Sequence, residues 1–322
     1  MEIKGRVLVT GATGFAGANI IPMLIAAGWQ VRACGRNSRY KPANCEFVAM
    51  DLAQESNLDA LVVDTDAVLH LAARTHVMRE VASDPLAEYR RSNVAPTARL
   101  VEAAARNKVK HFIFASSLKV HGETSGNRPI REDDPLRAQD PYGVSKIEAE
   151  RLVIEKSADS GMSASILRLP LMVGPGVKGN LLRLAKLVAS GVPLPFAAIS
   201  NRRSLLNVDN LGAAIFALLE KPVAGHRTYL ISDGHDVSTA DLLRSMATAL
   251  GRPARLFPFP QGLLRLAATA TGFGAEIRRL TDSLQVDISH IRDTLNWTPP
   301  FSFDEGIAKT IHAMVRPTAA IL

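Results

Sequence analysis

Tyr142 and Lys146 are the residues whose types and spacing say most about the chemistry of this chain; they lie in the run Asp140-Pro-Tyr-Gly-Val-Ser-Lys146. This spacing places a phenol and an ammonium group one helical turn apart, on the same face of a helix. A phenol normally keeps its proton until about pH 10, but a neighbouring cation favours the phenolate. We therefore predict a tyrosine that can exchange protons near neutral pH.

A glycine-rich run near the start of the chain, Gly11-Ala-Thr-Gly14-Phe-Ala-Gly17, directly follows the apolar segment 7–10. Glycines at this spacing allow a tight turn, let the backbone approach a pyrophosphate, and bring a helix against a strand. The following helix would offer free N–H groups and the positive end of its dipole. An ordinary strand–helix turn is the alternative, but the flanking strand and helix favour a dinucleotide site. Its expected contacts are Gly11, Thr13, Gly14, Phe15, Ala16 and Gly17.

Either motif alone would be a weak indication, but the two in this order point to hydride transfer on an alcohol or a ketone. A third element is the pair Ser116-Ser117, which ends an expected strand shortly before Tyr142. A hydroxyl at this strand end could share the substrate oxygen with the tyrosine. Either serine could instead cap the local backbone.

Short β-rich segments alternate with helical patterns through the first half of the chain. We expect strands at 6–10, 30–35, 46–50, 67–71, 111–116 and 163–169, and helices at 16–27 and 84–107. Alternation of this kind predicts an α/β fold, a Rossmann-type doubly wound parallel sheet with helices on both faces. We therefore place a dinucleotide-binding domain at 1–170.

Beyond Pro170, segments rich in proline and glycine separate shorter elements. We expect 171–322 to form mainly a smaller α/β substrate-binding region, with some segments returning to the first domain. This region would cover the carboxyl edge of the sheet, where ligands of doubly wound folds bind.

The end of the second expected strand bears on the choice of cofactor, because an NAD site usually has an Asp or Glu there for the ribose 2′-hydroxyl. The segment from Val31 to Arg39 contains no carboxylate. Arg36, with Arg32 or Arg39, could instead pair with a 2′-phosphate, unless these arginines are simply solvated. We favour NADP(H) and leave NAD(H) open. Asp51 and Leu52, which end the third strand, would lie beside the adenine.

Composition excludes several classes of protein. The formal charge is +7, but the basic residues are scattered in pairs, so we expect no nucleic acid and favour small anionic ligands such as phosphates. Cys34 and Cys45 have neither metal-ligand nor disulfide spacing, so we expect no metal and a reducing compartment. The chain leads straight into its first strand, which predicts a cytoplasmic protein without a secretory signal.

The longest apolar stretch near the C-terminus, 262–272, is too short to span a membrane and contains Arg265. It could touch a membrane surface, but we expect a helix that packs on its own protein. We therefore predict no integral membrane segment. The helix expected at 84–107 could pair with a copy of itself in a homodimer.

With these motifs in view, the chain resembles an extended short-chain dehydrogenase/reductase of the NAD(P)-dependent nucleotide-sugar epimerase/dehydratase family, over nearly its whole length. The resemblance rests on the glycine run, His70-Leu-Ala-Ala73, Tyr89-x-x-x-Asn93, Ser116-Ser117, Pro141–Lys146 and Leu167-Arg168. It implies that Ser117, Tyr142 and Lys146 carry the chemistry and that Lys146 also holds the nicotinamide ribose. Further cofactor contacts that it implies are Leu71, Ala72, Ala73, Asn93 and Pro170.

The same resemblance implies a UDP-sugar substrate. Asn180 and Arg203 match residues that meet the nucleotide diphosphate, and Arg278 or Arg279 could provide a second clamp. The expected substrate contacts are Arg74, Ser117, Lys119, Asn180, Leu181 and Arg203. Asn93 resembles a residue that steadies the strand and helix around the site, and a local helix bond is its alternative. His76 and His121 could tune the sugar pocket or lie at the surface, and Trp297 should pack in the core.

Departures from the family pattern narrow the reaction. Family dehydratases follow the catalytic hydroxyl with an Asp-Glu pair, but Leu118 and Lys119 stand there, so we do not expect dehydration. Epimerases usually retain NAD, and a carboxylate at the end of the second strand would suit NAD. That carboxylate is missing here. The segments 116–123, 176–180 and 201–204 are similar to bacterial reductases of UDP-4-keto-6-deoxy-N-acetylhexosamines, which serve O-antigen synthesis.

We therefore favour reduction of a 4-keto UDP-sugar, with hydride delivered to C4, a proton from Tyr142, and Ser117 on the same oxygen. One alternative is a UDP-hexose 4-epimerase with tightly bound NAD. A second is a catalytically silent nucleotide-sensing protein. It is disfavoured because Ser117, Tyr142 and Lys146 are all intact.

Overall fold

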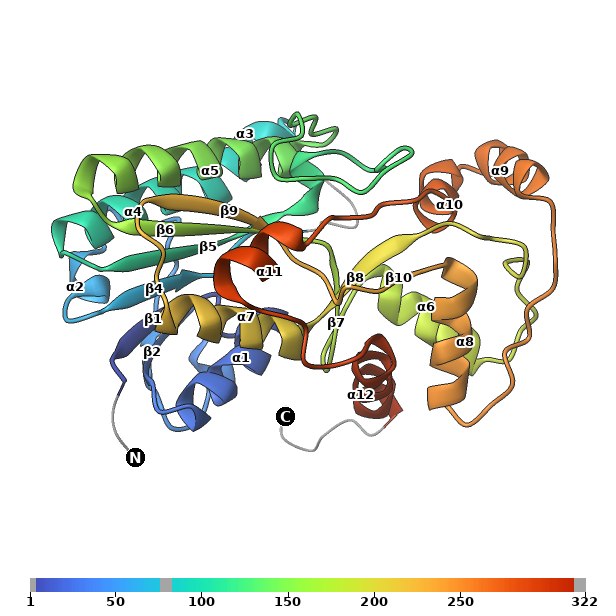
Figure 1. The fold of residues 1–322 in the computed structure, drawn as a ribbon, viewed down its shortest axis with the longest axis horizontal. Helices are drawn as coiled ribbons and strands as arrows, with labels where there is room; N and C mark the ends of the chain where they lie inside the picture. The colour runs from blue at the N-terminus through green and yellow to red at the C-terminus, as the bar shows by residue number, and fades with distance from the viewer. Residues whose placement is uncertain (1–3, 76–82, 316–322) are drawn as a thin grey trace.

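The fold is organised around a seven-stranded parallel sheet with the strand order β3-β2-β1-β4-β5-β6-β9 (Figure 1). The computed structural model describes residues 4–75 and 83–315. The strands are β1 (Arg6–Thr10), β2 (Gln30–Gly35), β3 (Glu46–Ala49), β4 (Ala67–His70), β5 (His111–Ser117), β6 (Ser163–Leu169) and β9 (His226–Leu230). The order reverses between β1 and β4, which opens a crevice at the carboxyl ends of these strands. The predicted doubly wound sheet is confirmed.

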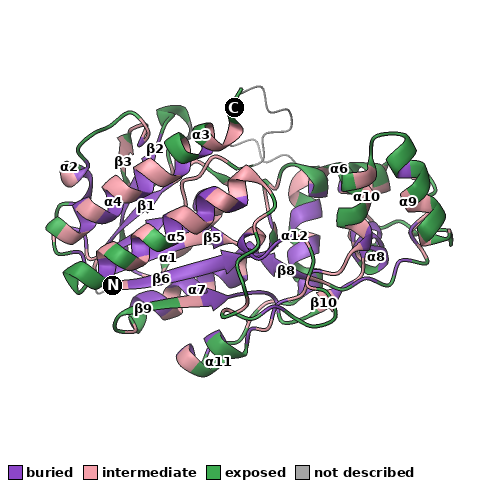
Figure 2. Ribbon diagram, turned by 90° about the horizontal axis from the view of Figure 1, so that it is seen from above, coloured by how far each residue is buried: buried purple, intermediate pink, exposed green. Residues whose placement is uncertain are grey.

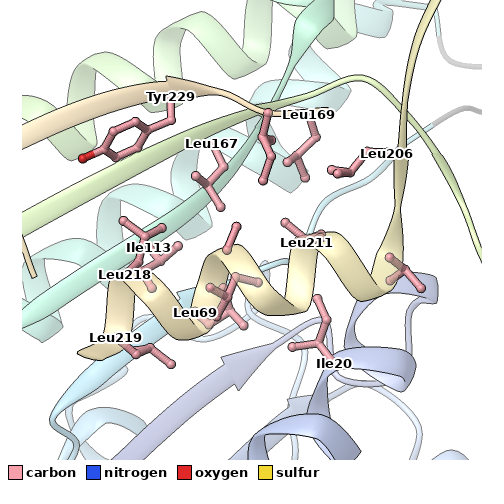
Figure 3. Close-up of a cluster of buried hydrophobic side chains, with 14 of the residues drawn as sticks. Ile20, Leu69, Ile113, Leu167, Leu169, Leu206, Leu211, Leu218, Leu219 and Tyr229 are labelled. Atoms are coloured by element: carbon pink, nitrogen blue, oxygen red, sulfur yellow. The ribbon is translucent and has the colours of Figure 1, made fainter. Parts of the chain in front are cut away.

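Helices cover both faces of this sheet and enclose two separate apolar cores. They are α1 (Phe15–Ala26), α2 (Asp59–Val62), α3 (Pro85–Tyr89), α4 (Ala95–Arg106), α5 (Pro141–Ser160), α7 (Val208–Glu220) and α11 (Ser289–Leu295), with 3₁₀ turns η1 (Ser38–Tyr40) and η3 (Leu118–Val120). Successive strand residues point to opposite faces. Accordingly Val7 and Val9 belong to the core under α1 and α7, while Leu8 belongs to the core under α4 and α5. Figure 3 shows Ile20, Leu69 and Leu211 meeting in the first of these cores.

A smaller lobe contains a three-stranded mixed sheet with its own apolar core. Its elements are β7 (Leu171–Val173), β8 (Arg203–Asn207), β10 (Asp236–Val237), α6 (Asn180–Ala189), α8 (Thr239–Ala249), α9 (Gln261–Ala270), α10 (Gly274–Thr281) and α12 (Phe303–Val315). β7 pairs parallel with β8, and β10 pairs antiparallel with it. Between these elements the chain returns to the large sheet through α7 and β9 (Figure 1). The division near residue 170 remains a prediction.

The segment 84–107 is not the single regular helix expected from the sequence. A π-helical turn, η2 (Arg90–Val94), separates α3 from α4. Pro96 lies just after this turn and has no N–H to donate to the carbonyl four residues earlier, which disfavours regular α-helix there. As a result Asn93 points inward and is only 3% exposed.

Gly174 directly follows β7, and its φ of 152° is open essentially only to glycine. A Cβ atom at this position would lie 2.5 Å from Cγ1 of Val208 and 3.3 Å from Cζ of Phe15. The close approach brings the start of α7 against the start of α1. Gly176 also has a positive φ, of 82°, but a Cβ atom on it would have no neighbouring atom within 4 Å.

We predict that Gly174→Ala lowers the free energy of unfolding by about 2–4 kcal/mol, because it adds a steric clash to backbone strain. Gly176→Ala, which adds strain alone, should cost about 1 kcal/mol. Chemical denaturation of both variants beside the wild type measures the difference. Equal losses for the two variants would contradict the close packing of Gly174 against Val208.

Candidate active site

The glycine loop between β1 and α1 forms a cradle in which Gly11 and Gly17 make close backbone contacts. A Cβ atom on Gly11 would lie 2.7 Å from the backbone nitrogen of Ala72, and one on Gly17 would lie 2.5 Å from the carbonyl oxygen of Gly11. α1 begins at Phe15 with no side-chain cap on its N-terminus. Its first-turn N–H groups therefore face the loop and are suited to a phosphate. The residues fit a dinucleotide diphosphate, and its contacts with them remain a prediction.

The loop after β4 is held against this cradle by a buried polar chain. The hydroxyl of Thr10 lies 2.6 Å from Nδ1 of His70, and Nε2 of His70 lies 2.9 Å from the hydroxyl of Thr97. Burial lowers the pKa of His70 to about 3, so the ring stays neutral. The backbone nitrogen of Ala72 donates to Thr10 Oγ1 over 3.3 Å. The half-buried residues that follow β4 and lie along the expected cofactor path are Leu71, Ala72 and Ala73.

Asn93 fastens the loop after β4 to the helix that carries Tyr142. Its Oδ1 accepts a hydrogen bond of 2.7 Å from the backbone nitrogen of Arg74. Its Nδ2 donates to the carbonyl of Arg74 over 3.1 Å and to the hydroxyl of Ser145 over 3.2 Å. These bonds fit the steadying role that the resemblance implied for Asn93. The side chain of Arg74 lies over the Tyr89 ring, 5.5 Å from its centroid.

The end of β2 differs in part from the sequence prediction. A Cβ on Gly35 would lie 3.1 Å from Cγ2 of Thr13, so this glycine packs directly on the cradle. Arg36 and Arg39 follow it and are exposed. Arg32 is not available for a phosphate: its Nε donates to Glu46 over 2.9 Å and its Nη1 donates to the carbonyl of Val63 over 2.7 Å. The parallel register opposes Arg32 to Glu46.

Asp51 and Leu52 lie just beyond β3. Asp51 accepts a hydrogen bond of 3.0 Å from the backbone nitrogen of Ala53, which shapes the turn there. Leu52 is buried, at 7% exposure, and its carbonyl accepts a 2.8 Å bond from Arg99. A contact with adenine remains a prediction for both residues.

Ser117, Tyr142 and Lys146 come together where β5 ends and α5 begins. Asp140 caps α5, with its Oδ1 accepting a 2.7 Å hydrogen bond from the backbone nitrogen of Gly143. The cap places Tyr142 in the first turn, where its hydroxyl hydrogen-bonds with Ser117. Nζ of Lys146 donates to the carbonyl of Ala115 over 2.7 Å. The expected three side chains thus occupy one site.

The electrostatics of this group differ from the sequence prediction. Burial raises the pKa of Tyr142 above its ordinary value, and the hydrogen bond from Ser117 offsets this only in part. Asp140 and Tyr89 raise it further. The ammonium of Lys146, which was expected to acidify the phenol, is turned towards the carbonyl of Ala115 and lies 4.4 Å from the Phe114 ring centroid.

Lys146 itself is strongly perturbed. It is 2% exposed, and burial lowers its pKa to about 8, while the negative charge of Glu150 acts in the opposite direction. Because the pKa is lowered, the ammonium is present below about pH 8 and is lost as the pH rises through that value. In the folded protein this lysine titrates near the physiological range.

A buried ion pair behind the site was not found by sequence reasoning. Nη2 of Arg168 lies 2.8 Å from Oε2 of Glu150, with side chains 7% and 2% exposed. The hydroxyl of Ser116 donates to Glu150, and Nη1 of Arg168 lies 2.9 Å from Nε2 of His121. Burial lowers the pKa of His121 to about 4, with Arg168 adding to the effect. The sequence held one sign of this pair: Glu150 follows Lys146 by four residues and so lies on the same face of the helix.

Lys119, expected as a substrate contact, is paired with two carboxylates. Its Nζ pairs with Asp140 and lies 3.1 Å from Oε1 of Glu123. Oε2 of Glu123 in turn lies 3.7 Å from Nε of Arg279 on α10. This chain of charges connects the start of α5 to the smaller lobe. His76 lies outside the described residues.

Arg203 and Arg279, both expected at a diphosphate, lie close together in the smaller lobe. Nη1 of Arg203 donates to the carbonyls of Arg279 and Asp282 over 2.8 and 3.0 Å. Burial lowers the pKa of Arg203 from its ordinary value. Of the two arginines that sequence left open, Arg279 meets Arg203 through its backbone carbonyl, and the side chains of both Arg278 and Arg279 are exposed on α10.

The remaining predicted contacts lie near the start of the smaller lobe. Asn180 is exposed at the first position of α6, and Leu181 beside it is 1% exposed. Pro170 is buried between β6 and β7. Trp297 is 6% exposed and belongs to the core under α7, which confirms its predicted packing role. Within residues 4–75 and 83–315, no cluster of potential metal ligands and no helix able to cross a bilayer is found.

Comparisons with known proteins agree with this geometry. Residues 7–232 match the family described as NAD dependent epimerase/dehydratase. A UDP-glucose 4-epimerase of Vibrio cholerae is 39% identical over 318 residues, which covers 98% of this chain and 97% of that protein. The N-acetyl-alpha-D-glucosaminyl-diphospho-ditrans,octacis-undecaprenol 4-epimerase of Escherichia coli O157:H7 is 26% identical over 96% of this chain and 95% of its own length. The solved structure of MoeE5 in complex with UDP-glucose and NAD is 28% identical, with a TM-score of 0.78, and the match covers 98% of this chain and 100% of that one.

We predict that Lys146 titrates with a pKa of about 8 in the ligand-free protein, well below its ordinary value of 10.5. The measurement is the pH dependence of the lysine ¹³Cε shift by NMR, with Lys146→Arg used for assignment. Glu150→Gln should lower the pKa further by removing a nearby negative charge. Glu148→Gln, on the same helix but paired with Arg90 at the surface, is the matched control and should leave it unchanged.

The wild-type titration decides this prediction even if Glu150→Gln, which leaves Arg168 buried without its partner, proves unstable. A wild-type Lys146 pKa near 10.5 would contradict the burial argument.

Proposed function

Because the chain belongs to the NAD dependent epimerase/dehydratase family, we propose that it is a 4-epimerase acting on a UDP-hexose. The observation that carries this proposal is the Ser117–Tyr142–Lys146 group, in a chain that aligns end to end with a UDP-glucose 4-epimerase at 39% identity. The second relative, from Escherichia coli, also bears a 4-epimerase name, and its substrate is likewise a hexosyl diphosphate. These relatives support the epimerase over the 4-reductase that the sequence motifs favoured.

In the proposed reaction a hydride and a proton leave C4 and its hydroxyl and then return, the hydride to the opposite face. A bound nicotinamide dinucleotide supplies the hydride acceptor and donor. Tyr142 holds the proton, taking it from the C4 hydroxyl and giving it back to the same oxygen. Ser117, hydrogen-bonded to Tyr142, holds that oxygen in place.

Proton removal by Tyr142 needs the phenolate, which burial disfavours in the arrangement described. We propose that the ammonium of Lys146 leaves the carbonyl of Ala115 and turns toward the phenol and the cofactor ribose. A cation at this distance would favour the phenolate. The residues proposed to hold the diphosphate are Arg203, Arg279 and the N-terminal turn of α6 at Asn180.

A second candidate is the NADPH-dependent reductase of a UDP-4-keto-6-deoxyhexose, because one observation favours it. β2 ends at Gly35, where an epimerase that retains NAD usually has a carboxylate, and the exposed Arg36 follows. A guanidinium at this position suits the 2′-phosphate of NADP(H). The NAD-bound structure that the chain resembles points the other way. Cofactor preference therefore separates the two candidates.

The deciding experiment incubates the purified protein with UDP-glucose and with UDP-N-acetylglucosamine and separates the products by chromatography. The epimerase predicts the galacto epimers, with no net oxidation of added NADH or NADPH. The reductase predicts no interconversion, and NADPH consumption with a UDP-4-keto-6-deoxyhexose. Arg36→Ala should weaken NADP(H) binding at least about tenfold, and NAD(H) binding little, only if Arg36 meets a 2′-phosphate. Failure of both activities would contradict both candidates.

We predict that Tyr142→Phe lowers turnover about 10²–10⁴-fold, because it removes the group that holds the proton. Tyr89→Phe is the matched control: its ring lies 6.0 Å from that of Tyr142, and its hydroxyl bonds only weakly, at 3.4 Å, with the carbonyl of Thr75. It should keep turnover within about threefold of wild type. Unchanged turnover in Tyr142→Phe would contradict the proposed role of Tyr142, whereas no turnover in the wild type would favour the silent nucleotide-sensing protein.

A further inference from the structure

Lys119 lies in the turn η3 at the end of β5, against the start of α5. β5 is buried along most of its length, and α5 packs beside it with part of its outer face exposed (Figure 2). The backbone nitrogen of Lys119 donates to the hydroxyl of Ser117 over 3.3 Å. A Cβ atom on Gly143, in the first turn of α5, would lie 2.9 Å from the carbonyl oxygen of Lys119. The backbone of Lys119 is therefore held between Ser117 and the first turn of α5.

The side chain of Lys119 contacts two carboxylates that come from different segments of the chain. Its Nζ pairs with Oδ2 of Asp140 and lies 3.1 Å from Oε1 of Glu123. The side chain of Lys119 is only 17% exposed, so solvent and salt screen the pair with Asp140 less than they screen a pair at the open surface. One ammonium group therefore compensates two negative charges at this junction.

Asp140 has two opposite effects on the first turn of α5. Its Oδ1 accepts the capping hydrogen bond of 2.7 Å from the backbone nitrogen of Gly143. A carboxylate in this position stabilises the helix, because negative charge is favourable at a helix N-terminus. The same charge disfavours ionisation of Tyr142, two residues later, and raises the pKa of that phenol. The cap that starts the helix therefore opposes the proton transfer proposed for the tyrosine.

Besides the cap, the charged and titratable groups around Tyr142 come from α3, α5 and the loop after β4. Tyr89 on α3 has its ring centroid 6.0 Å from that of Tyr142 and also raises the pKa of the phenol. The guanidinium of Arg74, after β4, lies over the Tyr89 ring. The ammonium of Lys146 is turned towards a carbonyl of β5. Lys119 contacts the capping carboxylate directly, so it acts on the charge that opposes ionisation.

We propose that Lys119 is a positioning residue for proton transfer by Tyr142, because its ammonium neutralises the carboxylate that caps α5. The inference rests on the proposed function, in which the phenol must lose its proton. With Lys119 in place, Asp140 caps the helix through one oxygen while its charge is compensated at the other. This role does not require Lys119 to touch the substrate.

The test measures ionisation at position 142 directly, by placing 3,5-difluorotyrosine there and following its ¹⁹F shift against pH. The fluorine atoms withdraw electrons and lower the phenol pKa, which brings the titration to lower pH. Lys119→Met should raise this pKa by about one unit, because the charge of Asp140 is then left uncompensated. Lys119→Arg should keep the pKa close to that of the protein with Lys119, since the guanidinium restores the positive charge.

A double-mutant cycle shows whether Lys119 acts through the cap. Asp140→Asn removes the charge but keeps an oxygen for the capping bond, so it should lower the pKa of the phenol. In that background Lys119→Met should shift the pKa about half as much or less, because its main partner is no longer charged. Lys156→Met is the matched control: Lys156 lies further along α5, 3.6 Å from Glu155, and its replacement should leave the pKa unchanged.

The pH dependence of turnover with UDP-glucose is the second measurement. Lys119→Met should move the rise of kcat to higher pH by the shift seen in the ¹⁹F titration and change KM less than about twofold. An unchanged phenol pKa in Lys119→Met, or an equal shift in both backgrounds, overturns the inference. So does a raised KM with an unchanged pH profile, because Lys119 would then be a substrate contact. A raised ¹⁹F pKa in Lys119→Met, in a protein whose wild type shows no turnover, supports the electrostatic role of Lys119 and contradicts the proposed function instead.

Discussion

The buried ion pair between Glu150 and Arg168 is the contact on which the geometry of the site depends. It joins α5 to β6, and the hydroxyl of Ser116 ties the same carboxylate to β5. Removing one partner of such a buried pair typically costs about 3–5 kcal/mol, because the other charge is left without compensation. Tyr142, Lys146 and Glu150 follow one another at helical spacing on α5. The pair therefore fixes the rotation of the helix and so aims the other two side chains at the end of β5.

Six strands of the large sheet could be predicted from the sequence because each is a short apolar segment bounded by turns or helical patterns. β1, β2 and β6 begin and end at the predicted residues. β9 was not found because it follows a long excursion into the smaller lobe and begins with the exposed His226 and Arg227. The role of Arg32 was misjudged for a related reason. Alternation along a strand predicts the face on which a residue lies. It does not predict that Glu46 lies opposite Arg32, because that depends on the register between β2 and β3.

The sequence predicted which residues form the site better than it predicted their pKa values. Helical spacing correctly places Tyr142 and Lys146 on one face, but it does not determine where the end of a long, flexible lysine side chain lies. Here the carbonyl of Ala115 and the face of Phe114 attract the ammonium, and burial then controls both pKa values. The tyrosine is shifted away from the phenolate and the lysine towards the neutral amine. A ligand that draws the ammonium toward the phenol would reverse the first shift, so the proposed proton transfer would be coupled to ligand binding.

The residues at the end of β2 favour NADP(H), whereas relatives of this chain are named as 4-epimerases, which usually retain NAD. An epimerase must keep its dinucleotide through two hydride transfers, whereas a reductase must exchange it after one. A Cβ atom on Gly35 would lie only 3.1 Å from Cγ2 of Thr13, so a carboxylate there would crowd that side chain. The exposed Arg36 offers a cation to a phosphate beyond it. The ribose 2′-hydroxyl of NAD would therefore find fewer partners at this strand end than in a site with an acidic residue. In the proposed epimerase, retention of the cofactor must therefore depend on contacts away from the adenosine ribose. These are Lys146 at the nicotinamide ribose and the glycine loop Gly11–Gly17 at the pyrophosphate.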